Sequence, residues 1–147
     1  MWNYFNPVEI IFGENRFKEV HDALKNKNYI IITHPEEIFK KYSDELKSSS
    51  NPPLSIMTDV QPNPDYKDIL ELQNKFSSIN ESVDYILAIG GGSVTDTAKA
   101  IAAFKDKQEY LTDFVRNKKS PRVENPIKII AIPTTSGTSS ELTCWAT

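Results

Sequence analysis

Cysteine and histidine are scarce in this sequence. Its 147 residues include one cysteine, Cys144, and two histidines, His21 and His34. A single cysteine excludes an intrachain disulfide and a cysteine-based zinc site, and we expect Cys144 to be a buried structural residue. The two histidines fall on different expected elements without metal-ligand spacing, and we expect His21 to lie on the surface. The sequence therefore predicts neither a metal ligand nor a catalytic residue within this chain.

The sequence also lacks an excess of basic charge and any long apolar run. A net charge of -3 and a pI near 5.4 argue against nucleic acid or a membrane surface as a partner. No apolar stretch approaches the roughly 20 residues that span a bilayer, and Met1 to Ile10 lacks the pattern of a signal peptide. We therefore expect a soluble cytoplasmic protein.

What the sequence does contain is a regular alternation of apolar runs and amphipathic stretches. Strands are expected at 8–12, 29–33, 54–60, 84–89 and 127–133, and helices at 15–25, 36–47, 65–76, 93–104 and 109–115. The run YIIIT at 29–33 is continuously apolar, as in strands buried on both faces of a parallel sheet. This spacing predicts one α/β domain over 1–147, with a Rossmann-like parallel sheet and helices on both faces.

Three of the five glycines stand side by side, directly after the expected strand at 84–89. Gly90, Gly91 and Gly92 would lie at the carboxyl end of that strand, where open parallel sheets bind ligands, and Ser93 would begin the next helix. Backbone without Cβ atoms at a helix N-terminus favours a diphosphate. A tight turn is the alternative, although one glycine usually suffices for a turn. The third glycine of a dinucleotide fingerprint would fall on Thr95, and no P-loop lysine follows.

A second polar segment follows the expected strand at 127–133. Six of the seven residues from 134 to 140 carry hydroxyl groups. Such a cluster at a strand end could bind phosphate, ribose or a carboxamide, or it could be a loop that caps a helix. Two polar, glycine-containing loops at neighbouring strand ends favour one shared ligand.

Four motifs together resemble one family. FNPVEIIFG at 5–13, VQPNP at 60–64, GGGSVTDTAKA at 90–100 and IPTTSGTSSELT at 132–143 are similar, in order and spacing, to the amino-terminal domain of iron-containing alcohol dehydrogenases. The resemblance covers essentially the whole chain. The segment SELTCWAT at 140–147 is most similar to the branch that acts on small aldehydes such as phosphonoacetaldehyde.

The resemblance implies a set of cofactor-binding residues. The glycine turn of the family holds the pyrophosphate of NAD or NADP, and the threonines of the second loop line its diphosphate and nicotinamide side. Asparagine in the QPNP motif would lie near the adenosine portion. The matching residues are Asn63, Gly91, Gly92, Ser93, Thr134, Thr135, Thr138 and Thr143. Asp96 matches a family aspartate, which could touch the site or only stabilise the start of its helix.

One departure from the family bears on the choice of cofactor. Many members that prefer NAD carry an aspartate just after the strand that corresponds to 29–33, where it binds the ribose 2′-hydroxyl. Here His34 occupies that place. We therefore expect NADPH to be tolerated, unless Glu36 or Glu37 reaches back to the ribose.

The family also binds a divalent metal, iron or zinc, through an aspartate and three histidines of a following helical domain. That domain is absent from these 147 residues, which stop without a polar tail, so we interpret the chain as a fragment of a two-domain enzyme. The parent would interconvert a small aldehyde and an alcohol, and we expect the chain alone to be inactive.

Two alternatives stay open at this point. The chain could be a stand-alone nucleotide-binding module without catalysis, or a fold relative of dehydroquinate synthase, which fits the segment PTTSGTSSE less well. The amino-terminal strand could also pair with a second subunit, giving a homodimer.

Overall fold

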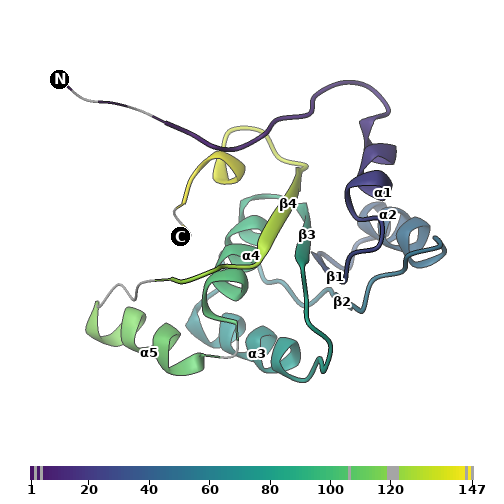
Figure 1. Cartoon of the computed structure of the whole chain (residues 1–147). Helices are drawn as coiled ribbons and strands as arrows, with labels where there is room; N and C mark the ends of the chain where they lie inside the picture. The colour runs from purple at the N-terminus through teal and green to yellow at the C-terminus, as the bar shows by residue number, and fades with distance from the viewer. Residues whose placement is uncertain (2, 4, 106, 119–122, 145, 147) are drawn as a thin grey trace.

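The computed structural model describes residues 1, 3, 5–105, 107–118, 123–144 and 146, which form an α/β fold around a parallel sheet (Figure 1). The strands of this part of the chain are β1 (Tyr29–Thr33), β2 (Ser55–Met57), β3 (Tyr85–Gly90) and β4 (Lys128–Pro133). Their order in the sheet is β2-β1-β3-β4, and every neighbouring pair is parallel. The expected Rossmann-like fold class is confirmed.

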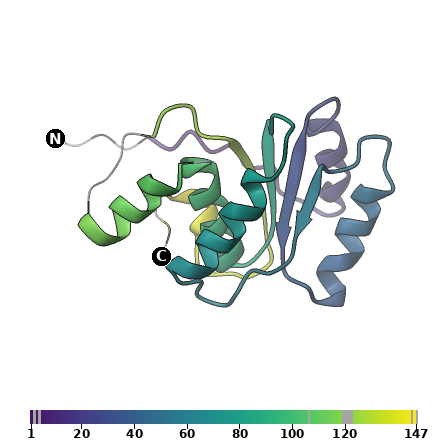
Figure 2. The ribbon, with the colours of Figure 1, turned by 90° about the horizontal axis from the view of Figure 1, so that it is seen from below.

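The helices cover both faces of the sheet, which lies between two helical layers (Figure 2). They are η1 (Arg16–Lys18), α1 (Glu19–Ala23), α2 (Glu37–Lys47), α3 (Tyr66–Ser77), α4 (Gly92–Phe104), α5 (Gln108–Asn117) and η2 (Ser140–Leu142), of which η1 and η2 are 3-10 helices. The helix expected at 15–25 is thus shorter than predicted and begins as a 3-10 turn.

The two faces of the sheet pack into two separate apolar cores. Ile30 and Ile32 of β1 point toward α3 and α4, whereas Tyr29 and Ile31 point toward α1 and α2. All five residues of β1 are buried, because β1 has a strand on each side and helices on both faces. This double burial explains why the sequence of the strand is apolar without alternation.

Three expectations drawn from the sequence are wrong. The segment 8–12 forms no strand, and Ile10, Ile11 and Phe12 are 68%, 54% and 94% exposed. An apolar run needs a neighbouring strand to accept its backbone hydrogen bonds, and within the described chain none pairs with it. Cys144 is exposed rather than buried, since the chain after η2 runs along the surface. The strand expected at 54–60 ends at Met57.

The carboxyl ends of the strands are held in register at one edge of the sheet. Thr33, the last residue of β1, donates a hydrogen bond from Oγ1 to the carbonyl oxygen of Ile89 at 2.7 Å. Gly90 and Pro133 are paired at the ends of β3 and β4. The loops that leave this edge therefore start from fixed points. None of the helices in the described ranges is long and apolar enough to cross a membrane.

Candidate functional site

A cavity of about 750 Å³ opens at this edge of the sheet, where the segments that follow all four described strands meet. Ligand cavities in proteins commonly measure about 300–1,000 Å³. Every residue that the sequence singles out for the cofactor lines this cavity. They are His34 after β1, Asn63 after β2, Gly91, Gly92, Ser93 and Asp96 after β3, and Thr134, Thr135, Thr138 and Thr143 after β4.

The three consecutive glycines allow close packing within the chain itself. A Cβ atom on Gly90 would come within 2.5 Å of Val94 Cγ2, which α4 buries against the sheet. A Cβ atom on Gly91 would lie 2.9 Å from Thr135 Oγ1, and one on Gly92 would lie 3.2 Å from Thr138 Cγ2. Glycine at 91 and 92 thus lets the threonine segment, residues 134–143, approach the turn that begins α4.

The N-terminus of α4 faces the cavity without a side-chain cap. Its N-cap residue is Gly91, so the helix begins one residue earlier than expected, and Ser93 lies in its first turn. The first backbone N–H groups of a helix have no acceptor within the helix and carry the positive end of its dipole. Gly91 and Gly92, which line the cavity, therefore present an anion-binding surface there.

The threonine segment is attached to this turn by its first residue. The backbone N–H of Thr134 donates to the carbonyl oxygen of Gly90 at 3.0 Å, continuing the pairing of β3 with β4. The next residues, up to Ser139, are exposed, whereas Ser140 is 6% exposed. The N-cap residue of η2, Ser139, makes no side-chain capping bond, but the hydroxyl of Thr138 accepts from the backbone N–H of Ser140 at 3.4 Å. The helix-capping alternative therefore holds for Thr138 and leaves the other hydroxyl groups unexplained.

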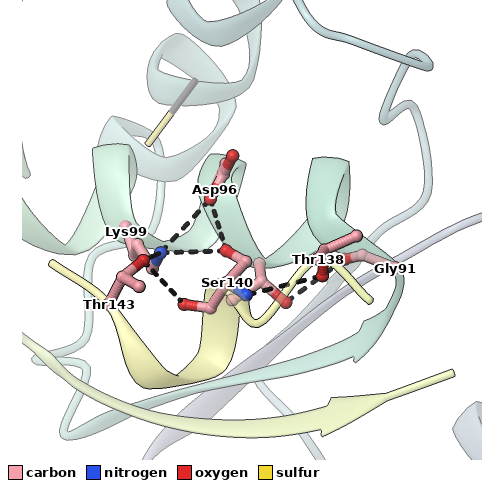
Figure 3. A network of polar contacts seen from close by, with 7 residues as sticks. Gly91, Asp96, Lys99, Thr138, Ser140 and Thr143 are labelled. Carbon is pink, nitrogen blue, oxygen red and sulfur yellow. Dashed lines mark hydrogen bonds and ion pairs between the residues drawn. The ribbon is translucent and has the colours of Figure 1, made fainter. Parts of the chain in front are cut away.

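A polar network joins α4 to the threonine segment (Figure 3). Lys99 Nζ lies 3.2 Å from Asp96 Oδ1, 2.9 Å from Ser140 Oγ and 3.4 Å from Thr143 Oγ1. The hydroxyl of Ser140 also donates to Asp96 Oδ1. The carboxylate of Asp96 thus contacts both Lys99 and Ser140, so its role is more than to stabilise the start of its own helix.

Lys99 and Ser140 were missed as site residues by the reasoning from sequence. The spacing of Asp96 and Lys99, three residues apart on one helix, is the signal that could have found the lysine, because such pairs share a helix face. Ser140 stood inside the hydroxyl-rich segment, but nothing in the sequence distinguishes it from its neighbours. Only the fold brings it beneath α4.

The loop between β2 and α3 forms the opposite wall of the cavity. Asn63 has a φ of 50°, in the left-handed region, and its backbone N–H donates to Ser93 Oγ at 3.0 Å. The loop ends at a capping box, in which the side chain of Asp65 accepts hydrogen bonds at the start of α3. The backbone N–H groups of Asp68 and Lys67, in that order of effect, lower the pKa of the Asp65 carboxyl below its ordinary value.

His34 directly follows β1, at the place where the family resemblance predicts the ribose of the adenosine half. Its ring centroid is 5.6 Å from that of Phe39, and both side chains line the cavity. Glu36, two residues further along the chain, also lines it, so a carboxylate is present near His34. Glu37 is not among the described residues that form the lining.

The residues present do not fit a metal site. Across the described ranges, no group of three or more His, Cys, Asp and Glu side chains is close enough to hold a metal ion. His21 Nε2 instead lies 3.2 Å from Glu45 Oε1, on the far side of the sheet from α4. The cavity does fit a dinucleotide, with an anion-binding helix start, hydroxyl groups on one wall and a polar loop on the other.

Comparison with known proteins gives a consistent match. The family model for iron-containing alcohol dehydrogenases matches residues 7–147. The chain is 28% identical over 146 residues to an alcohol dehydrogenase of Thermococcus barophilus, covering 92% of this chain and 38% of that one. It is 31% identical over 139 residues to the lactaldehyde reductase of Escherichia coli K12, covering 90% of this chain and 36% of that one.

A solved structure matches the fold over nearly the whole chain. Sulfoacetaldehyde reductase of Bifidobacterium kashiwanohense, solved in complex with NAD+, superposes with a TM-score of 0.82 at 29% sequence identity. The match covers 98% of this chain and 39% of that one. The chain therefore spans less than half the length of each of the proteins it matches here.

Proposed function

This chain belongs to the iron-containing alcohol dehydrogenase family, and on that premise we propose that it is the NAD(P)-binding domain of an enzyme interconverting a small aldehyde and an alcohol. One observation carries the proposal. The ten residues expected to bind the cofactor come from the ends of four different strands and line a single cavity. The parallel topology brings the four loops to one edge, and the polar and glycine residues on each of them make the cavity suited to a dinucleotide.

In this proposal the pyrophosphate lies at the start of α4. Its negative charge is stabilised by the free N–H groups and the dipole of that helix, beside Gly91, Gly92 and Ser93. The hydroxyl groups of Thr134, Thr135, Thr138 and Thr143 then supply hydrogen bonds to the diphosphate and to the nicotinamide side. A hydroxyl group suits both, because it donates and accepts.

The adenosine half lies on the opposite side of the turn, toward Asn63 and His34. Both line the cavity, and the Asn63 loop is fixed between its hydrogen bond to Ser93 and the capping box of α3. Because His34 carries no carboxylate, it does not repel a 2′-phosphate. We infer that this domain accepts NADPH as well as NADH.

The proposed substrate class is a small aldehyde or alcohol. The names of two relatives, lactaldehyde reductase and sulfoacetaldehyde reductase, support this class. The narrower assignment to phosphonoacetaldehyde stays a prediction from the last residues of the chain. The family name implies iron for the whole enzyme, and the described residues of this chain offer no set of ligands for it.

Titration of NADH fluorescence with the purified 147-residue chain tests the proposal. The titration is run with a chelator present, because none of the residues proposed to hold the cofactor depends on a metal. We expect saturable binding, and the same chain unfolded in denaturant serves as the control. A folded chain that shows no binding at millimolar NADH and NADPH would contradict the proposed function.

A further inference from the structure

Lys99 makes contacts with the threonine segment that its place in the sequence does not suggest. It lies on α4, 41 residues before Ser140 and 44 before Thr143, and its ammonium group is within hydrogen-bond distance of both hydroxyl oxygens. A third contact joins it to Asp96 Oδ1 on its own helix. A lysine ammonium has three N–H donors and no acceptor, so it can donate in all three of these contacts.

The lysine is held inside the molecule rather than facing the cavity. The side chains of Lys99 and Asp96 are 15% and 13% exposed. Asp96, Ser140 and Thr143 all line the cavity, whereas Lys99 is not among the described residues that do so. A mostly buried charge is stable only when it is paired and hydrogen-bonded. Lys99 therefore acts on the cavity through Asp96, Ser140 and Thr143.

The threonine segment has few other attachments to the rest of the described chain. Its start is held by the backbone bond from Thr134 to Gly90, and Asn6 Nδ2 donates to the carbonyl oxygen of Leu142 at 3.1 Å. Between these points the residues up to Ser139 are exposed. The contacts of Ser140 and Thr143 with Lys99 and Asp96 thus hold the far end of this segment against α4 (Figure 3).

We propose that Lys99 is a positioning residue, which fixes the threonine segment against α4 and thereby sets the affinity of the site for the nicotinamide half of the cofactor. The inference rests on the proposed function, since it concerns the same cavity. Without the ammonium group, the segment must lose conformational freedom when the ligand binds, and ordering of flexible groups weakens binding. In the proposed placement the adenosine half lies beside Asn63 and His34 rather than against this segment, so its affinity should not depend on Lys99.

A comparison of the whole cofactor with its adenosine half distinguishes this role from a general effect on folding. Lys99→Met removes the charge and keeps much of the length of the side chain, and Lys99→Arg restores a charged donor. Lys41→Met, an exposed lysine on α2, is the matched control. Affinities for NADH and for adenosine monophosphate are measured on each chain, together with the thermal unfolding midpoint.

We expect Lys99→Met to weaken NADH binding by about tenfold or more. Its affinity for adenosine monophosphate should stay within about twofold of that of the original chain. Lys99→Arg should recover most of the NADH affinity, and Lys41→Met should change the affinity for neither ligand. Backbone hydrogen exchange of residues 134–143 should be faster in Lys99→Met without ligand and unchanged in β1 and β3.

Several results would overturn the inference. Unchanged NADH affinity in Lys99→Met would do so, as would an equal loss for both ligands, which indicates a general loss of structure. If Lys99→Met does not fold, Lys99→Arg and Lys99→Gln carry the comparison, and equal NADH affinities of these two variants would contradict a role for the charge. Failure of the original chain to bind NADH would instead contradict the proposed function, and this inference with it.

Discussion

The backbone N–H of Asn63 donates a hydrogen bond to Ser93 Oγ across 3.0 Å, joining the loop before α3 to the first turn of α4. Asn63 holds a φ of 50°, which costs free energy for a residue other than glycine and aims this N–H at the serine. Within the described chain, no hydrogen bond donated by the Ser93 hydroxyl is found. That hydroxyl is thus able to accept from Asn63 and to donate to a phosphate oxygen.

The first prediction concerns this bond. Ser93→Ala leaves the Asn63 N–H without its acceptor, and we expect the free energy of unfolding to fall by about 0.5–1.5 kcal/mol and NADH affinity to fall. Ser78→Ala is the control, because Ser78 Oγ donates to the Lys75 carbonyl at 2.7 Å at the other end of α3. It should lower stability without changing NADH affinity. Equal NADH affinities in the two variants would contradict a role for Ser93 in the cavity.

The second prediction concerns Gly92. Gly92→Val places a branched side chain where the proposal puts the pyrophosphate, and its Cβ would lie 3.2 Å from Thr138 Cγ2. We expect NADH affinity to fall by at least about tenfold, or ~1.4 kcal/mol. Fluorescence titration measures the loss, and circular dichroism checks that the fold is retained.

Crowding within the chain and obstruction of the ligand can be told apart with Thr138. Thr138→Ser removes the methyl group nearest to the added Cβ atom. If the glycine serves only the packing of the threonine segment, Gly92→Ala combined with Thr138→Ser will bind NADH as well as Thr138→Ser alone. We predict that the combined variant stays weak, because the new Cβ atom meets the pyrophosphate.

The third prediction concerns the choice between NADH and NADPH. Since His34 carries no negative charge toward the ribose, the two cofactors should bind within about tenfold of each other, a difference of ~1.4 kcal/mol at most. His34→Asp should weaken the binding of NADPH more than that of NADH, and parallel titrations with the two cofactors measure this. Glu36→Gln is the companion variant, because Glu36 also lines the cavity. Strong rejection of NADPH by the original chain, relieved in Glu36→Gln, would show that Glu36 contacts the ribose instead.

The fourth prediction concerns stability at alkaline pH. Tyr29 is 1% exposed, and burial raises the pKa of its phenol, partly offset by a hydrogen bond with Ser49. A raised pKa means that the folded state holds the proton more tightly than the unfolded state. Its stabilising contribution is therefore complete below the ordinary pKa of 10.0 and is lost as pH rises above it.

Denaturant unfolding at several pH values tests this. The midpoint should fall above about pH 10, and in Tyr29→Phe the fall should be shallower, although that variant loses the hydrogen bond from Tyr29 Oη to the Asn51 carbonyl. A pH dependence that is identical in the two chains would mean that other groups determine alkaline unfolding.

The strands that have two neighbours were predicted well from the sequence. β1 has the bounds expected for it, and β3 differs by one residue at each end, because strands buried on both faces must be apolar at every position. The segment 8–12 is also rich in apolar residues, and composition alone does not reveal whether a partner strand is available. Ile10 and Phe12 are exposed for that reason.

The cavity was predicted in part. Residues at the ends of parallel strands could be grouped from the sequence, because the topology sends every such end to the same edge of the sheet. The contact between Lys99 and Ser140 could not, since it depends on how a loop folds back over a helix. The glycines were expected to let a ligand approach the backbone. The structure shows that the absence of Cβ atoms at Gly91 and Gly92 also lets Thr135 and Thr138 pack against them.

The position of bound cofactor tests the central claim most directly. Titration of the isotope-labelled chain with NADH, followed by the backbone amide resonances, should shift Gly91, Gly92 and Ser93 most, together with Asn63 and the threonine segment. A second cavity, of about 490 Å³, is lined by Phe104, Lys105 and Tyr110 among others and provides the internal comparison. If saturating NADH shifts those residues and leaves Gly91, Gly92 and Ser93 unchanged, the cofactor does not bind where this account places it.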